Sequence, residues 1–221
     1  MNTLTIRSLD TCHYAPIWQA MLEFTDNRLP ETQDELWLLQ HHPVITQGLA
    51  GKAEHILNPH QIPVVTSDRG GQATYHGPGQ LMVYTLFDLK RRKIGPRQLV
   101  NQLEQTIIEF LQLYDISAKR KENAPGVYRE EEKICSIGLR VRKGCSLHGL
   151  ALNVNMDLTP FNYINPCGFQ GLKLTQLSAH TNITKIEQIK PQIVAAFLQQ
   201  FGYTDSIEYK ALPQENTHGN L

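Results

Sequence analysis

Cysteine is scarce in this sequence, with four residues in a chain of 221. Four cysteines are too few to build a disulfide scaffold in a chain of this length. None forms a CxxC pair, and the histidines do not follow HExxH or another spacing that favours metal coordination. His41 and His42 are adjacent, so a strand would point them to opposite faces. We therefore expect reduced thiols and no metal site.

Net charge is absent as well, because 21 basic residues balance 21 acidic residues. Such a balance does not produce the strong positive field of a nucleic-acid-binding protein. No apolar run approaches the length of a membrane span, and the polar start MNTLTIRSLDTCHY lacks the pattern of a signal peptide. These absences predict a soluble, cytoplasmic protein without nucleic-acid or membrane partners.

A nucleotide-binding phosphate loop is also missing. The segment QGLAGKAEH at residues 47–55 contains glycines and a lysine. However, the spacing before Lys52 is too short, and neither serine nor threonine follows it. This absence argues against a P-loop nucleotide site.

Apolar residues recur at helical spacing in three segments. Helices are expected over residues 14–29, over residues 96–114 and over about residues 185–201, where Pro191 implies a late start or a kink. The second helix has the clearest apolar stripe. That stripe consists of Leu99, Leu103, Ile107, Phe110, Leu111 and Tyr114.

Shorter apolar runs predict strands over residues 4–9, 35–48, 64–66 and 81–89, with an interruption at Pro43. Residues 125–158 are typical of a three-stranded meander, with turns near residues 130–132 and at Lys143-Gly144. Strands with intervening helices and a meander predict an α+β (mixed α/β) fold. Without a repeat or linker, we expect one domain over residues 1–221; a small C-terminal subdomain from about residue 168 is the alternative.

The segment RGGQATYHGPGQ at residues 69–80 is dense in residues with special backbone properties. Glycines let backbone N–H groups approach a ligand closely, and Arg69 adds a fixed positive charge. An ordinary hairpin with glycine at its turns would show the same pattern. We therefore keep two interpretations, a ligand cradle and a hairpin.

Two positions in the meander have ambiguous roles. Gly149 marks a place where another backbone approaches closely, and a satisfied, partly buried imidazole is the better interpretation of His148. Lys133 falls on the same strand face as Cys135, where a lysine usually extends to solvent. If Lys133 faces a pocket instead, its ammonium would activate a nearby thiol, or a desolvated amine would act as a base.

Cys167 lies in the segment NPCGFQG at residues 165–171, outside any expected helix or strand. Pro166 fixes its own φ, and Gly168 permits tight geometry, so the thiol is expected on a sharp bend. The other thiols have different settings: Cys135 and Cys145 in strands, Cys12 in an N-terminal loop. Cys167 is therefore the candidate nucleophile, and an incidental surface thiol is the alternative.

Four ordered segments resemble the lipoyl(octanoyl) transferases, also called octanoyl-carrier-protein:protein N-octanoyltransferases. They are RGGQATYHGPGQLMVY from Arg69, APGVY from Ala124, KICSIGLRVRKGCSLHGLALNVNMDL from Lys133 and NPCG from Asn165. The resemblance extends from the first expected helix to about Ser178 and is loose after Ala179. It implies a fold shared with biotin and lipoate protein ligases, a mixed sheet flanked by helices.

The resemblance also implies a reaction and its partners. An octanoyl or lipoyl group passes from the phosphopantetheine of acyl carrier protein to a cysteine, here Cys167. A lysine of a lipoyl domain then attacks the thioester; such domains belong to 2-oxoacid dehydrogenases and the glycine cleavage H protein. Since a thioester is already activated, no further cofactor is implied.

Residue by residue, the resemblance makes Lys133 the lysine that activates Cys167. It also implies a substrate-binding set in three segments. The set comprises Arg69, Gly70, Gly71, Gln72, Ala73, Thr74, Tyr75 and His76, then Ser136, Ile137 and Gly138, then Gly149, Leu150 and Ala151, with His148 adjoining the site. Ile137, Leu139 and Leu150 are expected to form a slot for the acyl chain.

Three other functions remain as alternatives. An ATP-dependent lipoate ligase would share the fold, but such ligases have paired arginines before the glycine loop, where this chain has Asp68-Arg69, and need no cysteine nucleophile. A non-catalytic binder of lipoyl domains would leave Cys167 inert. A thioesterase would require water to outcompete lysine at the acyl-enzyme.

Three basic runs could dock the acidic partners that the resemblance implies, despite the zero net charge. They are residues 90–93, 119–121 and 140–143. Ordinary solvated surface is the alternative for each run.

Overall fold

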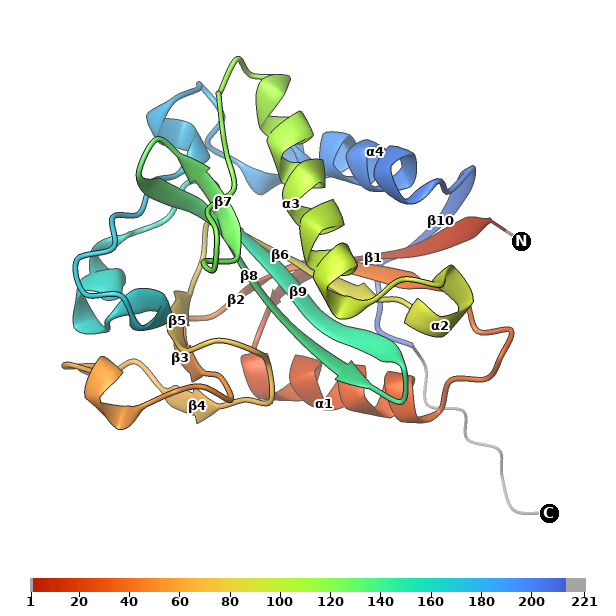
Figure 1. Ribbon diagram of the computed structural model, residues 1–221, viewed down its shortest axis with the longest axis horizontal. Helices are drawn as coiled ribbons and strands as arrows, with labels where there is room; N and C mark the ends of the chain where they lie inside the picture. Colours follow the sequence, from red (N-terminus) through yellow and green to blue (C-terminus); the bar gives the residue numbers. More distant parts are fainter. Residues whose placement is uncertain (1, 214–221) are drawn as a thin grey trace.

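A seven-stranded mixed sheet runs through the computed structural model, which describes residues 2–213 (Figure 1). Its strand order is β10-β1-β2-β6-β9-β8-β7. Strand β1 is parallel to its neighbours β2 and β10, and the other neighbouring pairs are antiparallel. The strands are β1 (Thr3–Cys12), β2 (Glu35–His41), β6 (Gln80–Leu86), β7 (Gly126–Arg129), β8 (Glu132–Arg142), β9 (Cys145–Asn153) and β10 (Asp205–Tyr209).

A second, three-stranded sheet lies beside the first and has the order β4-β3-β5. Its strands are β3 (Val44–Gln47), β4 (Val64–Thr66) and β5 (Ala73–His76). The antiparallel pairing of β3 with β5 places residue 73 opposite residue 47. This small sheet fixes both ends of the glycine-rich segment that precedes β5.

Helices cover both faces of the large sheet. Figure 1 shows α3 and α4 on one face and α1 on the other. The helices are α1 (Tyr14–Asp26), α2 (Leu89–Arg92), α3 (Pro96–Gln112) and α4 (Lys190–Phe201), and short 3-10 turns include Pro166–Gly168. The larger hydrophobic core lies between the sheet and α3 and α4, and a smaller one lies under α1.

Local sequence explains these elements. The stripe from Leu99 to Leu111 is fully buried against the sheet, and Pro96 occupies the first turn of α3, where its missing N–H costs nothing. Lys143 and Gly144 both have positive φ, which a two-residue hairpin between β8 and β9 requires. The predictions of α3 and of the β8–β9 turn each rested on a pattern within one segment.

The α+β architecture, the three long helices and the three-stranded meander are confirmed. The last helix starts late, at Lys190, as Pro191 implied. The assignment of Cys12 to a loop was wrong, because this residue pairs with His41 as the last residue of β1. The sequence analysis also missed α2, β5 and β10; β5 and β10 pair with strands distant in sequence. No helix within residues 2–213 is long and apolar enough to cross a membrane.

Candidate active site

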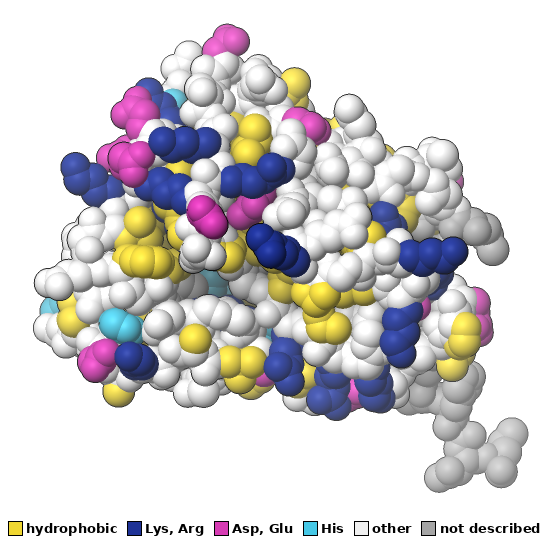
Figure 2. Space-filling view, viewed as in Figure 1, with side chains coloured by type: hydrophobic (Ala, Val, Ile, Leu, Met, Phe, Trp, Pro, Cys, Tyr) yellow, Lys and Arg dark blue, Asp and Glu magenta, His cyan; other side chains and the backbone are white. Residues whose placement is uncertain are grey.

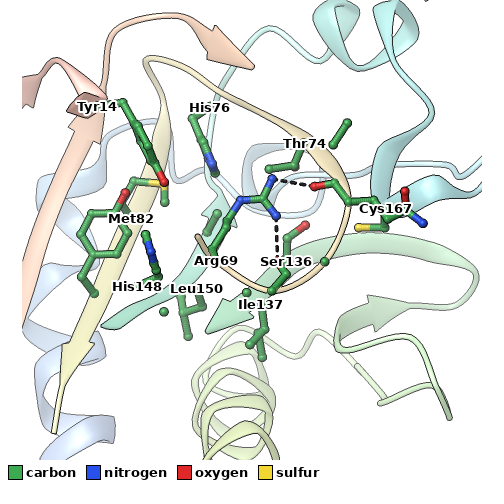
Figure 3. Close-up of a pocket in the computed structure, with 18 residues that line it drawn as sticks. Tyr14, Arg69, Thr74, His76, Met82, Ser136, Ile137, His148, Leu150 and Cys167 are labelled. Carbon is green, nitrogen blue, oxygen red and sulfur yellow. Dashed lines mark hydrogen bonds between the residues drawn. The ribbon is translucent and has the colours of Figure 1, made fainter. Parts of the chain in front are cut away.

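A pocket opens over the middle of β8 and β9, and the glycine-rich segment covers it. It encloses about 490 Å³ of space, part of it open to solvent. Figure 3 shows Cys167 on one side, Tyr14, Met82 and His148 on the other, and Arg69 between them. The pocket thus has a thiol end and an inner end.

The thiol end is built by the 3-10 turn Pro166–Gly168. Cys167 has φ 56° and ψ 17°, and Gly168 also has a positive φ of 78°. A cysteine in the left-handed region is uncommon, and such strain tends to occur at functional sites. Hydrogen bonds from Gly168 N–H to Asn165 O and from Phe169 N–H to Pro166 O hold the turn. The sharp bend predicted for Cys167 is confirmed.

Lys133 directs its ammonium at this thiol, with 3.3 Å between Nζ and Sγ. The residue is 2% exposed, so it does not extend to solvent as lysines at strand ends usually do. Burial by itself lowers the pKa of Lys133, but the nearby Cys167 and Tyr128 outweigh it, and the pKa lies above its usual value. The ammonium form therefore predominates at neutral pH, where it can stabilise a thiolate.

Four further residues, to which the sequence analysis assigned no role, surround this lysine. Nζ donates to Pro125 O at 3.0 Å and lies over the Tyr128 ring at 5.2 Å. The next N–H, of Gly126, donates to the buried carboxylate of Glu104 at 2.9 Å. A Cβ on Gly126 would lie 2.5 Å from the backbone oxygen of Cys135 and 2.9 Å from Cε of Lys133, so only glycine fits. The sequence did contain one signal for Glu104: it directly follows Leu103 of the apolar stripe in α3, where a glutamate is unusual.

Arg69 organises the glycine-rich segment from within. Its guanidinium donates to the backbone oxygens of Gly70, Gln72 and Thr46 at 2.6–2.9 Å, and also to Thr46 Oγ1. Most N–H donors of the Arg69 guanidinium are therefore bonded to the protein itself. Gly70 N–H in turn donates to Leu139 O at 2.8 Å, which ties the segment to the sheet.

The floor of the pocket needs a very close approach of backbones at Gly149. A Cβ there would lie 2.0 Å from Val83 O on β6. Gly149 and Gly138 are also directly opposite each other in the β8–β9 pair, so neither presents a side chain. The prediction of a close approach at Gly149 is confirmed.

His148 lies at the inner end, where it is 1% exposed and has φ 62°. Its Nε2 donates to the Asp68 carboxylate at 2.8 Å, and Trp18 Nε1 donates to the same oxygen at 2.8 Å. Burial lowers the pKa of His148, and the bond to Asp68 opposes this effect only in part. The imidazole is therefore neutral at neutral pH. The expectation of a satisfied, partly buried ring was wrong, because His148 is almost fully buried and its Nδ1 has no hydrogen-bond partner within the described residues.

Most of the predicted substrate-binding residues meet at this pocket. The lining includes Arg69, Gly70, Gly71, Gln72, Ala73, Thr74, His76, Ser136, Ile137, Gly138, His148, Gly149, Leu150, Ala151 and Cys167. Tyr75 does not line it, because its ring packs edge-on against Phe161 at 5.6 Å. Leu139 also lies outside the lining, so its predicted place in the slot was wrong.

Tyr14, Met82 and Tyr84 line the pocket but were not predicted. Met82 and Tyr84 alternate on β6, and the run 81–89 was correctly predicted to be a buried strand. Only the pairing of β6 with β9 shows which of its faces meets the pocket. Tyr14 comes from the first residue of α1, for which the sequence offered no signal.

The arrangement suits acyl transfer. A strained thiol beside a buried ammonium supplies a nucleophile, and the floor of Ile137, Leu150 and Ala151 can accept an apolar chain. Within residues 2–213, no group of three or more His, Cys, Asp or Glu side chains is placed to hold a metal ion.

Comparisons with known proteins place this site in a family. The model of the lipoyl protein ligase A/B catalytic domain matches residues 13–198. The octanoyltransferase of Shewanella denitrificans is 54% identical over 96% of this chain and 94% of its own, and that of Shewanella loihica is 56% identical over 91% and 93%.

The fold has solved counterparts at much lower identity. The bi-partite lipoate protein ligase of Thermoplasma acidophilum, described with its E2 lipoyl domain, superposes with a TM-score of 0.72 at 15% identity over 96% of this chain and 88% of its own. At that identity the likeness concerns the fold alone. Because the family model and the close relatives each span nearly the whole chain, the protein belongs to the lipoyl protein ligase A/B family and, within it, to the octanoyltransferases.

Proposed function

We propose that this protein transfers an octanoyl group to a protein lysine through a thioester formed on Cys167. The observation that supports the mechanism most directly is the 3.3 Å contact between Cys167 Sγ and Lys133 Nζ. This contact lies where the turn Pro166–Gly168 meets a pocket with an apolar floor. The family assignment supports the octanoyl group as substrate.

The first half-reaction loads the enzyme. Cys167 Sγ attacks the thioester carbonyl carbon of the donor, and the new C–S bond pushes the carbonyl electrons onto oxygen. When the intermediate collapses, the C–S bond to the donor breaks, and the leaving thiolate takes the proton that Lys133 holds. A raised lysine pKa suits this role, because the ammonium first stabilises the thiolate and then acts as an acid.

The second half-reaction transfers the chain. A neutral lysine amine of the acceptor attacks the acyl-enzyme carbonyl, an amide bond forms, and Cys167 Sγ leaves as a thiolate. The proton lost by the amine returns to Lys133, so the pair ends as it began. Passing through a cysteine divides one transfer into two steps of similar chemistry.

The expected donor is octanoyl acyl carrier protein, and the expected acceptors are lipoyl domains, including those of 2-oxoacid dehydrogenases and the glycine cleavage H protein. The lipoyl domain solved with a fold relative supports this class of acceptor. No added cofactor is needed, because the donor thioester provides the driving force. A lipoate ligase would instead require ATP to activate a free acid.

Intact mass spectrometry tests this function. The enzyme is incubated with octanoyl carrier protein without ATP or magnesium, and the adduct is mapped by peptide analysis. An octanoyl adduct at Cys167 that moves onto a lipoyl domain supports the proposal. An enzyme that remains unmodified, but joins free octanoate to the domain when ATP is added, would instead be a ligase.

Acidic side chains lie among the basic runs and compete with an acidic partner for them. Figure 2 shows Lys and Arg side chains mixed with acidic ones over both ends of the β8–β9 hairpin, rather than one continuous basic surface. Arg142 and Lys143 both pair with Asp26, at 2.8 and 2.9 Å. These bonds lower the pKa of Asp26 to about 2. Docking of an acidic partner at this run would have to compete with Asp26.

A further inference from the structure

The Gln72 carboxamide lies at the thiol end of the pocket. Gln72 and Cys167 both line the pocket, and the Gln72 side chain packs on Gly168, the residue after the nucleophile. A Cβ on Gly168 would lie 2.8 Å from both Cδ and Nε2 of Gln72. The amide nitrogen is therefore the polar atom that Gln72 presents to the turn of the nucleophile.

The amide oxygen of this carboxamide gains no hydrogen bond from folding. Oε1 is buried and has no hydrogen-bond partner within the described residues. Buried polar groups are normally paired, and one that is not calls for an explanation. An apolar side chain of the same shape would avoid this cost, so packing does not explain the amide.

The backbone of Gln72, in contrast, is held firmly. Its carbonyl oxygen accepts from Arg69 Nη2 at 2.7 Å and from Gly48 N–H at 3.3 Å, and Ala73 begins β5. The side chain therefore projects from a fixed point beside the turn. A preorganised donor of this kind loses little freedom when charge develops near it.

Resting on the proposed function, we infer that Gln72 Nε2 donates a hydrogen bond to the oxyanion that forms on the acyl carbonyl in both half-reactions. The backbone N–H of Cys167 is a second donor, because Gly168 and Phe169 N–H are already bonded within the turn while Cys167 N–H has no backbone acceptor in the described chain. Two donors beside the nucleophile are the usual composition of an oxyanion hole. Gln72 is thus a catalytic residue as well as part of the lining.

The test compares two reactions of the same thiol. Acylation by octanoyl carrier protein passes through an oxyanion, whereas alkylation by iodoacetamide displaces iodide from a saturated carbon and forms none. Gln72→Met should lower the single-turnover acylation rate by about 10²–10³-fold, the loss typical of one oxyanion donor. Alkylation of Cys167 should proceed at the wild-type rate, and the circular dichroism spectrum should match that of the wild type, which shows that the variant is folded.

Two further variants serve as controls. Gln102→Met removes another carboxamide whose Oε1 is buried and unpaired, but on α3 outside the pocket lining, and should leave both rates unchanged. Gln72→Lys restores a donor and should recover most of the acylation rate.

The inference is overturned if Gln72→Met acylates at the wild-type rate, or if it loses acylation and alkylation equally. In the second case Gln72 only shapes the turn. If the wild-type enzyme itself forms no adduct at Cys167, it is the proposed function that fails.

Discussion

The thiol end and the inner end of the pocket differ in the charge state of their buried titratable groups. At the thiol end, Lys133 keeps its charge although it is buried, because Cys167 and Tyr128 lie next to it. At the inner end, burial lowers the pKa values of the lining residues His76 and His148. It also lowers the pKa of His41, whose ring packs against the lining residues Tyr14 and Tyr84. The inner histidines are therefore neutral at neutral pH.

Hydrogen bonds hold two of the neutral rings in place. His41 Nδ1 donates to Cys12 O at 3.0 Å, and its Nε2 accepts from Tyr84 O–H at 2.6 Å. His76 is bonded at both ring nitrogens, to Gln80 and Thr46. Neutral rings with fixed tautomers form a rigid wall, whereas the Cys167 turn contains strained backbone. The inner end thus gives the pocket a fixed shape, and the thiol end carries the reactive groups.

The largest expected effect comes from removing the nucleophile. Cys167→Ala should abolish octanoyl transfer to a lipoyl domain, because no acyl-enzyme can form. The thiol is only partly buried, so unfolding by denaturant should shift little. Cys135→Ala is the control: that thiol is fully buried, and its loss should cost stability, by a few kcal/mol at most, without loss of transfer. Normal transfer by Cys167→Ala would refute the covalent mechanism.

Replacing the buried ammonium should have the next largest effect. Lys133→Met should lower turnover by about 10²-fold or more, since it removes both thiolate stabilisation and the acid. Alkylation of Cys167 by iodoacetamide should slow at pH 7, and its rate–pH profile should move to higher pH. Without the neighbouring positive charge, less of a thiol is ionised at a given pH. An unchanged profile would show that Lys133 does not tune the thiol.

Lys133→Arg separates the two roles of the lysine, because guanidinium keeps the charge but does not deprotonate. A reactive thiol in an inactive Arg variant would assign proton transfer to Lys133. An active Arg variant would assign electrostatics alone.

The neutral histidines near the inner end should affect the pH dependence of stability rather than catalysis. Burial lowers the pKa of His41 from 6.5 to about 4, so the unfolded chain binds more protons in that interval. The free energy of unfolding should therefore fall as the pH drops from 6.5 to 4, by about 3 kcal/mol for this group. Denaturant titrations of His41→Gln should give a shallower dependence than wild type, and His42→Gln, which changes an exposed ring, should not. Equal slopes in all three proteins would show that the inner histidines are not held neutral.

The smallest effect is expected at the surface near the β8–β9 turn. Reversing Arg140, Arg142 and Lys143 to glutamate should weaken binding of the acidic carrier protein more at low salt than at high salt. Asp26→Ala should act in the opposite direction, because it releases Arg142 and Lys143 from their ion pairs. Affinities that stay constant across salt in every variant would mark this run as ordinary solvated surface.

Elements with local signals could be predicted from the amino-acid sequence. The stripe of α3, the late start of α4, the Lys143-Gly144 turn and the bend at Cys167 follow from spacing, proline and glycine within a few residues. Resemblance in four ordered segments supplied the pairing of Lys133 with Cys167. Local pattern could not, because periodicity did not show whether the lysine faced solvent or a pocket.

Tertiary structure alone decided the contacts between segments distant in the chain. The placement of Tyr14 and Met82 in the pocket, the support of Lys133 by Glu104 and the packing of Gln72 on Gly168 all depend on which strands pair and which loops meet. The same holds for β10, which exists as a strand because β1 offers it a parallel edge. Desolvation and hydrogen-bond satisfaction depend on the whole neighbourhood of a group. For that reason only the folded chain distinguishes a charged buried lysine from a neutral buried histidine.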